Sequence, residues 1–296
     1  MAMLWVIHHS IHRPAPAVTP AIWEQAIPAR HFFSPERLLV ATWDGEPVAW
    51  CHWFLENQRS VCLAAFCFDA SPQGETAAVA LLTEFQRQVV SAGAVSIHAG
   101  ISPESRWGYQ GLDPIGQGIG IDVADDRVNQ LLEDAGFEEA RRIDRWEVAT
   151  IDYRPPVSRE SVLFRRGTRI ELAAMPPMTP DQAAAMFHLE VKKYQLVAPG
   201  GGAPLATAEI WLSDPDIHVM STNHSILGRV DSDKSDLSAR EAAIRCLLAL
   251  IIPLLAEKQI RSLYHSVPSD SHDVAARMAA LKFRRTAVGR LLRKSL

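Results

Sequence analysis

The feature that most restricts the fold is a correspondence between the two halves of the chain. At an offset of 166 residues the halves align without a gap from a long helical stretch through the strand after it. Like residues mark this alignment: Ala77, Leu81, Leu82, Ser96 and Ile97 fall on Ala243, Leu247, Leu248, Ser262 and Leu263. The order of helix, strand, short helix, Phe and strand also repeats, and Phe137 then corresponds to Phe283. This pattern favours a duplication, with one loop about twenty residues shorter in the second half.

The first half carries the pattern of a mixed sheet. Its strands are predicted at Met3–His8, Leu38–Thr42, Val48–Phe54, Val61–Phe68, Val95–Ile101 and Arg142–Ile151. The pair around Asp44-Gly45 is a hairpin signal. Helices are predicted from Thr19 to Ala26, from Ala77 through Val89, and from Asp125 to Ala135, the last ended by Gly136. A strand, crossover helix and strand among hairpin-linked strands predicts an α/β (α+β) fold, a mixed and mostly antiparallel sheet with helices on both faces.

The second half follows a linker at Arg154–Ser158, which divides the chain into predicted domains 1–155 and 156–296. It begins with a strand over Thr168–Ala174 and a helix after Thr179-Pro180. The stretch from Val197 to Val230 is broken by Gly and Pro and is left unassigned. Beyond it we expect a helix opened by a capping box of Ser238 and Glu241, a strand over Arg261–Val267, a helix over His272–Ala280, and an extended end.

Composition restricts the class of protein. The chain has 296 residues, which suits two domains of roughly 150. A net charge of -4 does not give the positive field of a sequence-independent nucleic-acid binder, so we expect no nucleic-acid partner. The most apolar run, Cys246–Ala256, is far too short to span a bilayer, and the N-terminus does not resemble a signal peptide. Four cysteines in apolar runs, none in a CxxC pair, indicate reduced thiols, and we expect a cytoplasmic protein without membrane contact.

One segment carries a recognisable motif. Residues 73–82 read QGETAAVALL, at the junction between a buried strand and a helix. A helix start presents free backbone N–H groups and the positive end of a dipole, so it can hold a diphosphate if small residues let the anion approach. The segment resembles the acyl-CoA signature of the GCN5-related N-acetyltransferase (GNAT) superfamily, with Gln73, Thr76 and Ala78 at the patterned positions. Residues 131–137, LLEDAGF, are similar to the end of that family's last helix.

The resemblance implies a function and a site. It implies a tandem pair of GNAT-like domains that uses acetyl-CoA as co-substrate and transfers the acetyl group to an amine of a small molecule or peptide. The amine attacks the thioester carbonyl directly, and backbone N–H groups of the preceding strand polarise that carbonyl. The expected cofactor-binding residues are Phe66, Cys67, Phe68, Gln73, Gly74, Glu75, Thr76, Ala77 and Ala78.

Departures from the pattern separate the two halves. Thr76 replaces a glycine and Glu75 adds a carboxylate, and both changes should weaken CoA binding. Leu132 stands where many members carry a tyrosine that protonates the leaving thiolate, so that role does not transfer. In the second half the equivalent start, Ala239–Ala243, has no glycine and follows Asp231, Asp233 and Asp236. Because these carboxylates would repel a diphosphate, we expect a degenerate second copy that keeps the fold and not the cofactor.

The loop from Ile101 to Ala124 leaves the C-terminal end of a strand, beside the expected cofactor. Loops of this length are commonly functional. Tyr109 is the candidate acid or oxyanion donor, and Arg106 and Trp107 are candidates for acceptor contacts; packing of Trp107 and Tyr109 against the fold is an equal alternative.

Metal ligation is not favoured. His8, His9 and His12 have no Cys or acidic residue close in sequence, so we expect no metal site. The alternative to an enzyme is a catalytically inactive binding or scaffold protein that reuses the fold.

Overall fold

A computed structural model describes residues 1–11, 18–30, 33–102, 109–112, 115–157, 159–175, 177–214, 216 and 220–296. These residues form two compact units. Unit 1 comprises Met1–Asp144, Thr179–His188 and Ala287–Leu296, and unit 2 comprises Arg145–Met178 and Leu189–Thr286. Each unit therefore draws on both halves of the sequence, and the expected boundary at residue 155 stays a prediction.

Unit 1 contains most of the elements expected for the first half. Its helices are α1 (Ala2–Ser10), α2 (Pro20–Ala26), α3 (Pro72–Ser91), α4 (Asp126–Asp134) and α6 (Pro180–Met186), with short 3-10 turns at Pro35–Arg37 and Ile115–Gln117. Its strands are β1 (Leu38–Trp43), β2 (Glu46–Leu55), β3 (Ser60–Phe68), β4 (Ser96–Ala99) and β5 (Ile121–Asp122). The first part of β6 (Glu138–Ala149) and most of β12 (Arg284–Ser295) also belong to it.

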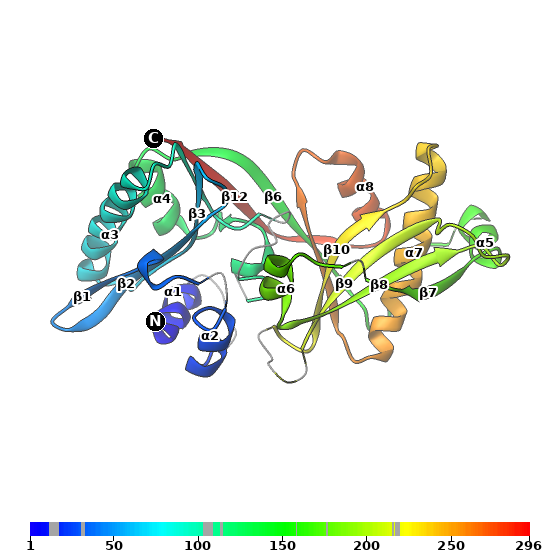
Figure 1. Ribbon diagram of the computed structural model, residues 1–296. Coiled ribbons are helices and arrows are strands. Elements are labelled where there is room, and N and C mark those ends of the chain that lie inside the picture. The colour runs from blue at the N-terminus through cyan, green and yellow to red at the C-terminus, as the bar shows by residue number, and fades with distance from the viewer. Residues whose placement is uncertain are drawn as a thin grey trace. The chain divides into compact units, whose positions relative to one another are not determined.

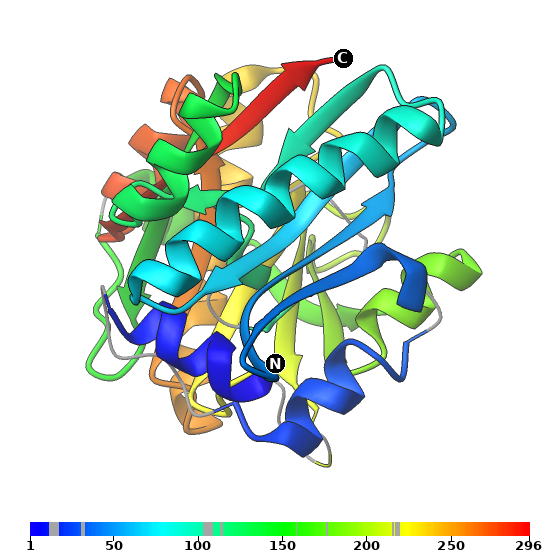
Figure 2. The ribbon, with the colours of Figure 1, turned by 90° about the vertical axis from the view of Figure 1, so that its left-hand side faces the viewer.

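The sheet of unit 1 is mixed, as predicted. Strands β1, β2 and β3 are antiparallel neighbours, β3 and β4 run parallel, and β12 pairs antiparallel with β4. The hairpin turn holds Asp44 and Gly45 at φ of 50° and 85°, the left-handed values that a two-residue type I′ turn requires. Helix α3 runs along one face of the sheet (Figure 2), and its apolar side shares a core with that face of β2 and β3 and with α4. On the other face, Trp5 of α1 and Trp23 of α2 contact Trp50 of β2.

The expectation of a strand at Met3–His8 is wrong, because this segment is helix α1. On a strand, Trp5 and His8 would point to opposite faces, whereas on a helix residues three apart share a face. Both side chains are buried, 0% and 1% exposed, and α1 packs against β3. The pattern of buried positions is therefore helical, although an apolar run this short does not by itself distinguish a helix from a strand.

Unit 2 repeats this architecture (Figure 1). Its strand order is β7-β8-β9-β10-β11, followed by the second part of β6; β10 and β11 are parallel and the earlier neighbours antiparallel. Helix α7 packs on β8 and β9 over a separate apolar core. The bounds are α5 (Arg159–Arg166), β7 (Arg169–Ala173), β8 (Leu189–Val197), β9 (Ala206–Ser213), β10 (His224–Asp231), α7 (Leu237–Glu257), β11 (Ser262–Pro268) and α8 (His272–Ala280).

The repeat is visible in the element bounds. Strands β4 and β11 begin 166 residues apart, and the nine-residue helices α4 and α8 begin 146 apart, which confirms the loop shortened by twenty residues. Both helices are followed by a left-handed residue, Gly136 at φ 85° and Lys282 at φ 65°. The capping box expected at Ser238 is wrong: Asp236 caps α7, and its carboxylate accepts the Ala239 N–H at 2.7 Å. Asp is as good an N-cap as Ser, so the helix begins two residues earlier.

Candidate functional site

A gap opens in unit 1 where two parallel strands separate. Pairing of β3 with β4 ends at Leu63 and Ala99, and the last bond across it runs from Gly100 N–H to the Leu63 carbonyl at 3.0 Å. Strand β3 continues for five residues to Phe68, paired on its other side with β2. We call the space beside this unpaired part of β3 the β3–β4 gap.

A bulge directs backbone groups into the gap. The register of β3 on β2 shifts between His52 and Trp53, so that β3 carries one extra residue, Ala64. Beyond the shift, Asp69 N–H bonds the Val48 carbonyl. Because adjacent residues of an antiparallel pair alternate between facing the partner and facing away, the backbone groups of Phe66 and Phe68 point away from β2.

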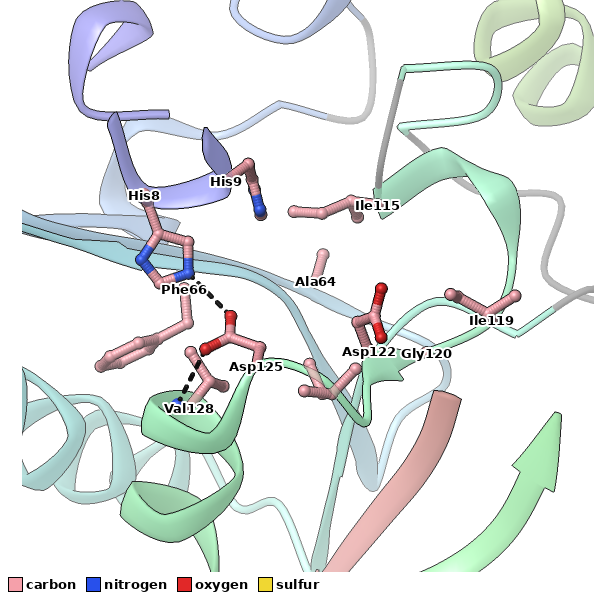
Figure 3. A pocket seen from close by; sticks show the side chains of 11 residues that line it. His8, His9, Ala64, Phe66, Ile115, Ile119, Gly120, Asp122, Asp125 and Val128 are labelled. Carbon is pink, nitrogen blue, oxygen red and sulfur yellow. Dashed lines mark hydrogen bonds and ion pairs between the residues drawn. The ribbon is translucent and has the colours of Figure 1, made fainter. Parts of the chain in front are cut away.

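A pocket lies in the gap (Figure 3). Residues of α1, β3, the loop before β5, β5 itself and the start of α4 line it: His8, His9, Ala64, Phe66, Ile115, Ile119, Gly120, Ile121, Asp122, Asp125 and Val128. Its volume is about 50 Å³, room for a water molecule or two.

His8 closes one end of the pocket. Its Nδ1 lies 3.0 Å from the Phe68 carbonyl and 3.3 Å from the Phe68 N–H, and its Nε2 lies 3.0 Å from Asp125 Oδ2. The other carboxylate oxygen of Asp125 accepts the Val128 N–H and so caps α4. One imidazole thereby ties α1 to β3 and α4, and it occupies backbone groups of Phe68 that the sequence analysis assigned to the cofactor.

The start of α3, the expected phosphate cradle, follows directly after β3. Pro72 at its first position has no N–H, and the Ser71 hydroxyl accepts the Gly74 N–H at 3.0 Å. The Asp69 carboxylate accepts the Ser71 N–H at 2.9 Å, and a Cβ on Gly74 would approach Asp69 Oδ1 to 2.1 Å, so only glycine fits there. The start of α3 therefore offers fewer free backbone N–H groups than an uncapped helix start, and the Asp69 carboxylate lies beside it.

The remaining expected cradle residues divide by exposure. Gly74 and Ala78 are buried, Ala77 is half-buried, and Gln73, Glu75 and Thr76 are exposed. The Thr76 hydroxyl donates to the Pro72 carbonyl at 2.8 Å. The structure thus places a run of small side chains at the end of β3, but it brings only Phe66 of the expected set into the lining of the pocket.

Arg127 is a cation at this site that the sequence analysis missed. From the first turn of α4 its Nη2 donates to the Asp69 carbonyl at 2.7 Å, and its guanidinium carbon lies 4.1 Å from the centroid of the Phe68 ring. Its buried Nε and Nη1 have no hydrogen-bond partner among the described residues. The sequence places Arg127 two residues after the N-cap Asp125, but only the folded structure shows that this position lies against the end of β3.

Tyr109 lies outside this pocket. It is fully buried at φ 58°, stacks on Trp5, and its hydroxyl lies 2.9 Å from His52 Nδ1. Burial raises the pKa of Tyr109, and it lowers the pKa of His52 to about 4, with a smaller contribution from the charge of Arg37. The role expected for Tyr109 stays a prediction, and Arg106 and Trp107 lie outside the described residues.

In unit 2 the equivalent helix start is crowded by acidic and paired groups. Asp236 caps α7, and Asp231 forms ion pairs with Arg229 at 2.8 Å and Arg240 at 3.4 Å. The paired charges hold the pKa of Asp231 below its usual value, chiefly through the hydrogen bond from Arg229.

Comparison with solved structures decides the fold. A tandem GNAT protein from the clavulanic acid biosynthesis pathway matches 99% of this chain and 94% of its own, with a TM-score of 0.64 and 11% identity. A GCN5-related N-acetyltransferase from Sphaerobacter thermophilus matches 99% of this chain and 91% of its own, with a TM-score of 0.64 and 14% identity. The chain has the GNAT fold.

A further structure with this fold belongs to a protein of stated acceptor class. The GCN5-related glucosamine N-acetyltransferase region of a fungal multi-domain GH3 β-N-acetylglucosaminidase matches 99% of this chain and 36% of its own, with a TM-score of 0.66 and 11% identity. No family model and no curated protein matches the sequence. Among the described residues, no helix is both long and apolar enough to cross a membrane.

Proposed function

We propose that this protein is an acyl-CoA-dependent N-acyltransferase that uses acetyl-CoA as co-substrate, and that unit 1 carries the reaction. The acceptor is an amine of a small molecule or peptide. The fold supports this proposal, because the solved structures that share it include N-acetyltransferases, one of them a tandem GNAT protein. We also propose a cytoplasmic location, where the four buried and unpaired thiols would stay reduced.

The observation that carries the proposal is the β3–β4 gap with its pocket. A strand edge whose backbone groups are not used by a neighbouring strand can bind an extended amide-containing chain, as an added strand would. The gap ends at the start of α3, so an extended ligand with a phosphate group could use both features at once. The backbone groups of Phe66 would polarise a thioester carbonyl, and Arg127 would supply positive charge near the phosphates.

Unit 2 is proposed as a copy that keeps the fold without the cofactor. Asp231, Asp233 and Asp236 precede α7, and no glycine lies among them or in the first turn of the helix. Like charges at such distances repel a diphosphate even in water.

A second candidate is a non-catalytic binding protein with the same fold. The observation that favours it is the use of donors around α3: Ser71 caps Gly74, Pro72 offers none, and His8 occupies Phe68. On this reading the small pocket is a remnant. The two candidates differ in one measurable property, the affinity for acetyl-CoA.

Calorimetric titration of the full chain with acetyl-CoA tests the proposal. We expect saturable binding to one site per chain, weakened at least about tenfold by Thr76→Glu, because the new carboxylate would face the phosphates. Thr83→Glu is the matched control: Thr83 is exposed on the same helix, and its hydroxyl also bonds the carbonyl four residues earlier, at 2.9 Å. Absence of binding at millimolar acetyl-CoA would reject the transferase and favour the non-catalytic protein.

A further inference from the structure

We propose that His9 is the proton acceptor of the transfer reaction and that His8 is its positioning residue. This inference rests on the proposed function of unit 1. It gives a catalytic role to residues of α1, the segment that the sequence pattern indicated as a strand. The two residues are adjacent histidines whose rings have different surroundings.

His9 faces the pocket. Figure 3 shows its ring reaching from α1 toward Ala64 of β3, with Ile115 beside the ring and Asp122 beyond Ala64. The ring is half-buried, and its Nε2 lies 3.8 Å from the Cys67 thiol. Ala64 and Phe66, the bulged part of β3 that would hold the thioester, line the same pocket. The His9 imidazole is therefore close to where the amide C–N bond would form.

His8 cannot take this role, because both of its ring nitrogens are engaged by Phe68 and Asp125 and the residue is 1% exposed. It fixes the last turn of α1 instead. Neighbouring residues on a helix are rotated by about 100°, so anchoring His8 against β3 and α4 turns the His9 ring to the edge of the strand. The two rings meet edge to face, with centroids 4.9 Å apart.

The other titratable groups around the pocket are less suited. Asp125 caps α4 and binds His8, and Asp122 Oδ1 accepts the Ala124 N–H at 3.0 Å. Burial raises the pKa of the Cys67 thiol well above its usual value, so the thiol stays neutral. Of the side chains here, an imidazole is the type that ordinarily changes charge nearest to physiological pH, and in its neutral form it accepts a proton readily from an attacking amine.

The proton balance is simple. The free amine attacks the thioester carbonyl carbon, a C–N bond forms and the C–S bond breaks, and the sulfur leaves with the bonding electron pair. One N–H proton passes to the unprotonated ring nitrogen of His9. His9 then returns this proton to the thiolate, so that the products are an amide and free CoA and the imidazole ends neutral.

The test compares three glutamine variants in the full chain. His9→Gln keeps a polar side chain but cannot accept the proton, and we expect kcat to fall about 100-fold or more while the Kd for acetyl-CoA changes less than twofold. His8→Gln should lower kcat and keep the acid limb of the rate profile, because His9 is still present. His98→Gln is the control. His98 lies on β4, forms an ion pair with Glu56, and does not line the pocket. Thiol release from acetyl-CoA is followed with the best acceptor from a screen of amino sugars, amino acids, polyamines and peptides.

A second readout does not need turnover. Histidine NMR of the protein without acetyl-CoA, with the His9 signal assigned by its loss in His9→Gln, should show an imidazole whose titration midpoint matches the acid limb of kcat/KM. The groups facing His9 during this titration are His8, Cys67, Asp122 and Asp125. Acetyl-CoA binding with an unchanged rate and pH profile in His9→Gln overturns the role of His9 alone. Failure of the natural chain to bind acetyl-CoA or release thiol overturns it together with the proposed function.

Discussion

The two units share one architecture and differ at the place where their parallel strands separate. In unit 1 the position at the mouth of the gap is the small, buried Ala99; in unit 2 the residue 166 positions later is His265. The His265 Nδ1 lies 2.8 Å from the Leu227 carbonyl, and burial lowers the pKa of this imidazole to about 4. In unit 2 a neutral side chain therefore bonds the Leu227 carbonyl, whereas in unit 1 a backbone group, the Gly100 N–H, bonds the Leu63 carbonyl across the parallel strands. The helix starts also differ, because Arg127 of α4 bonds the Asp69 carbonyl just before α3, whereas Asp236 caps α7 and Asp231 pairs with Arg240 of its first turn.

Under the proposed function, this difference separates fold from site within one chain. The cores behind both sheets are built from equivalent apolar helix positions, so the architecture survives in both copies. The site depends on a few residues at the strand ends. A substitution there changes ligand chemistry without touching the core.

The largest expected effect tests the equivalence of the cores. Leu82 and Leu248 occupy matched positions on α3 and α7 and are 2% and 0% exposed. Leu82→Ala and Leu248→Ala should each cost about 2–5 kcal/mol of unfolding free energy, through lost burial and the cavity left behind. Urea unfolding followed by circular dichroism measures this. If one substitution cost less than about 1 kcal/mol, the matched positions would not be equivalent.

The next effect concerns the buried imidazoles. His52 is 0% exposed and has a pKa of about 4, below the ordinary value near 6.5. Between these values the unfolded chain binds a proton that the native chain does not, so stability falls as the pH drops from about 6.5 to 4, by up to about 3 kcal/mol for this group. His52→Phe should flatten this part of the curve of unfolding free energy against pH.

Tyr109→Phe is the control for the His52 prediction. It removes the same 2.9 Å hydrogen bond and leaves the imidazole in place. The pH slope should therefore persist in Tyr109→Phe while its stability at pH 7 falls. An equal slope in His52→Phe and the natural chain would contradict the proposed burial of a neutral His52.

The smallest effect compares the carboxylates at the two helix starts. Asp69→Asn removes a negative charge beside the proposed phosphate site and keeps an acceptor for the Ser71 N–H, so acetyl-CoA should bind about fivefold more tightly, corresponding to about 1 kcal/mol. Asp236→Asn is the equivalent change in unit 2 and should leave the affinity unchanged, since Asn also caps helices well. Titration calorimetry distinguishes them. A tighter complex from Asp236→Asn would place the ligand in unit 2.

Much of the fold follows from the sequence. The Asp44-Gly45 turn, the unbroken apolar run of β3 and the helical spacing from Ala77 onward are local signals, and each element formed where expected. The shared order of elements also predicted the repeat. Local signals failed where tertiary packing decides, as at α1, whose short apolar run fits a helix or a strand equally. Strands β8, β9 and β10 were not predicted, and Gly and Pro interrupt the stretch that holds β9 and β10.

The candidate site was less predictable than the fold. The motif around Gly74 located the helix start, but the pocket residues His8, His9, Asp122 and Asp125 come from segments more than a hundred positions apart in sequence. Only the helical turn of α1 brings the two histidines to β3. The placement of His8 and His9 depends on which face of α1 is buried. The pocket could therefore not be predicted while this segment was assigned as a strand.

The most direct test of the central claim is a crystal structure of the full chain with acetyl-CoA. We predict one molecule per chain, with its thioester beside Phe66 in the β3–β4 gap and its phosphates at the start of α3 next to Arg127. Density for acetyl-CoA at the start of α7, or an empty gap at a concentration that saturates binding in solution, would contradict the account.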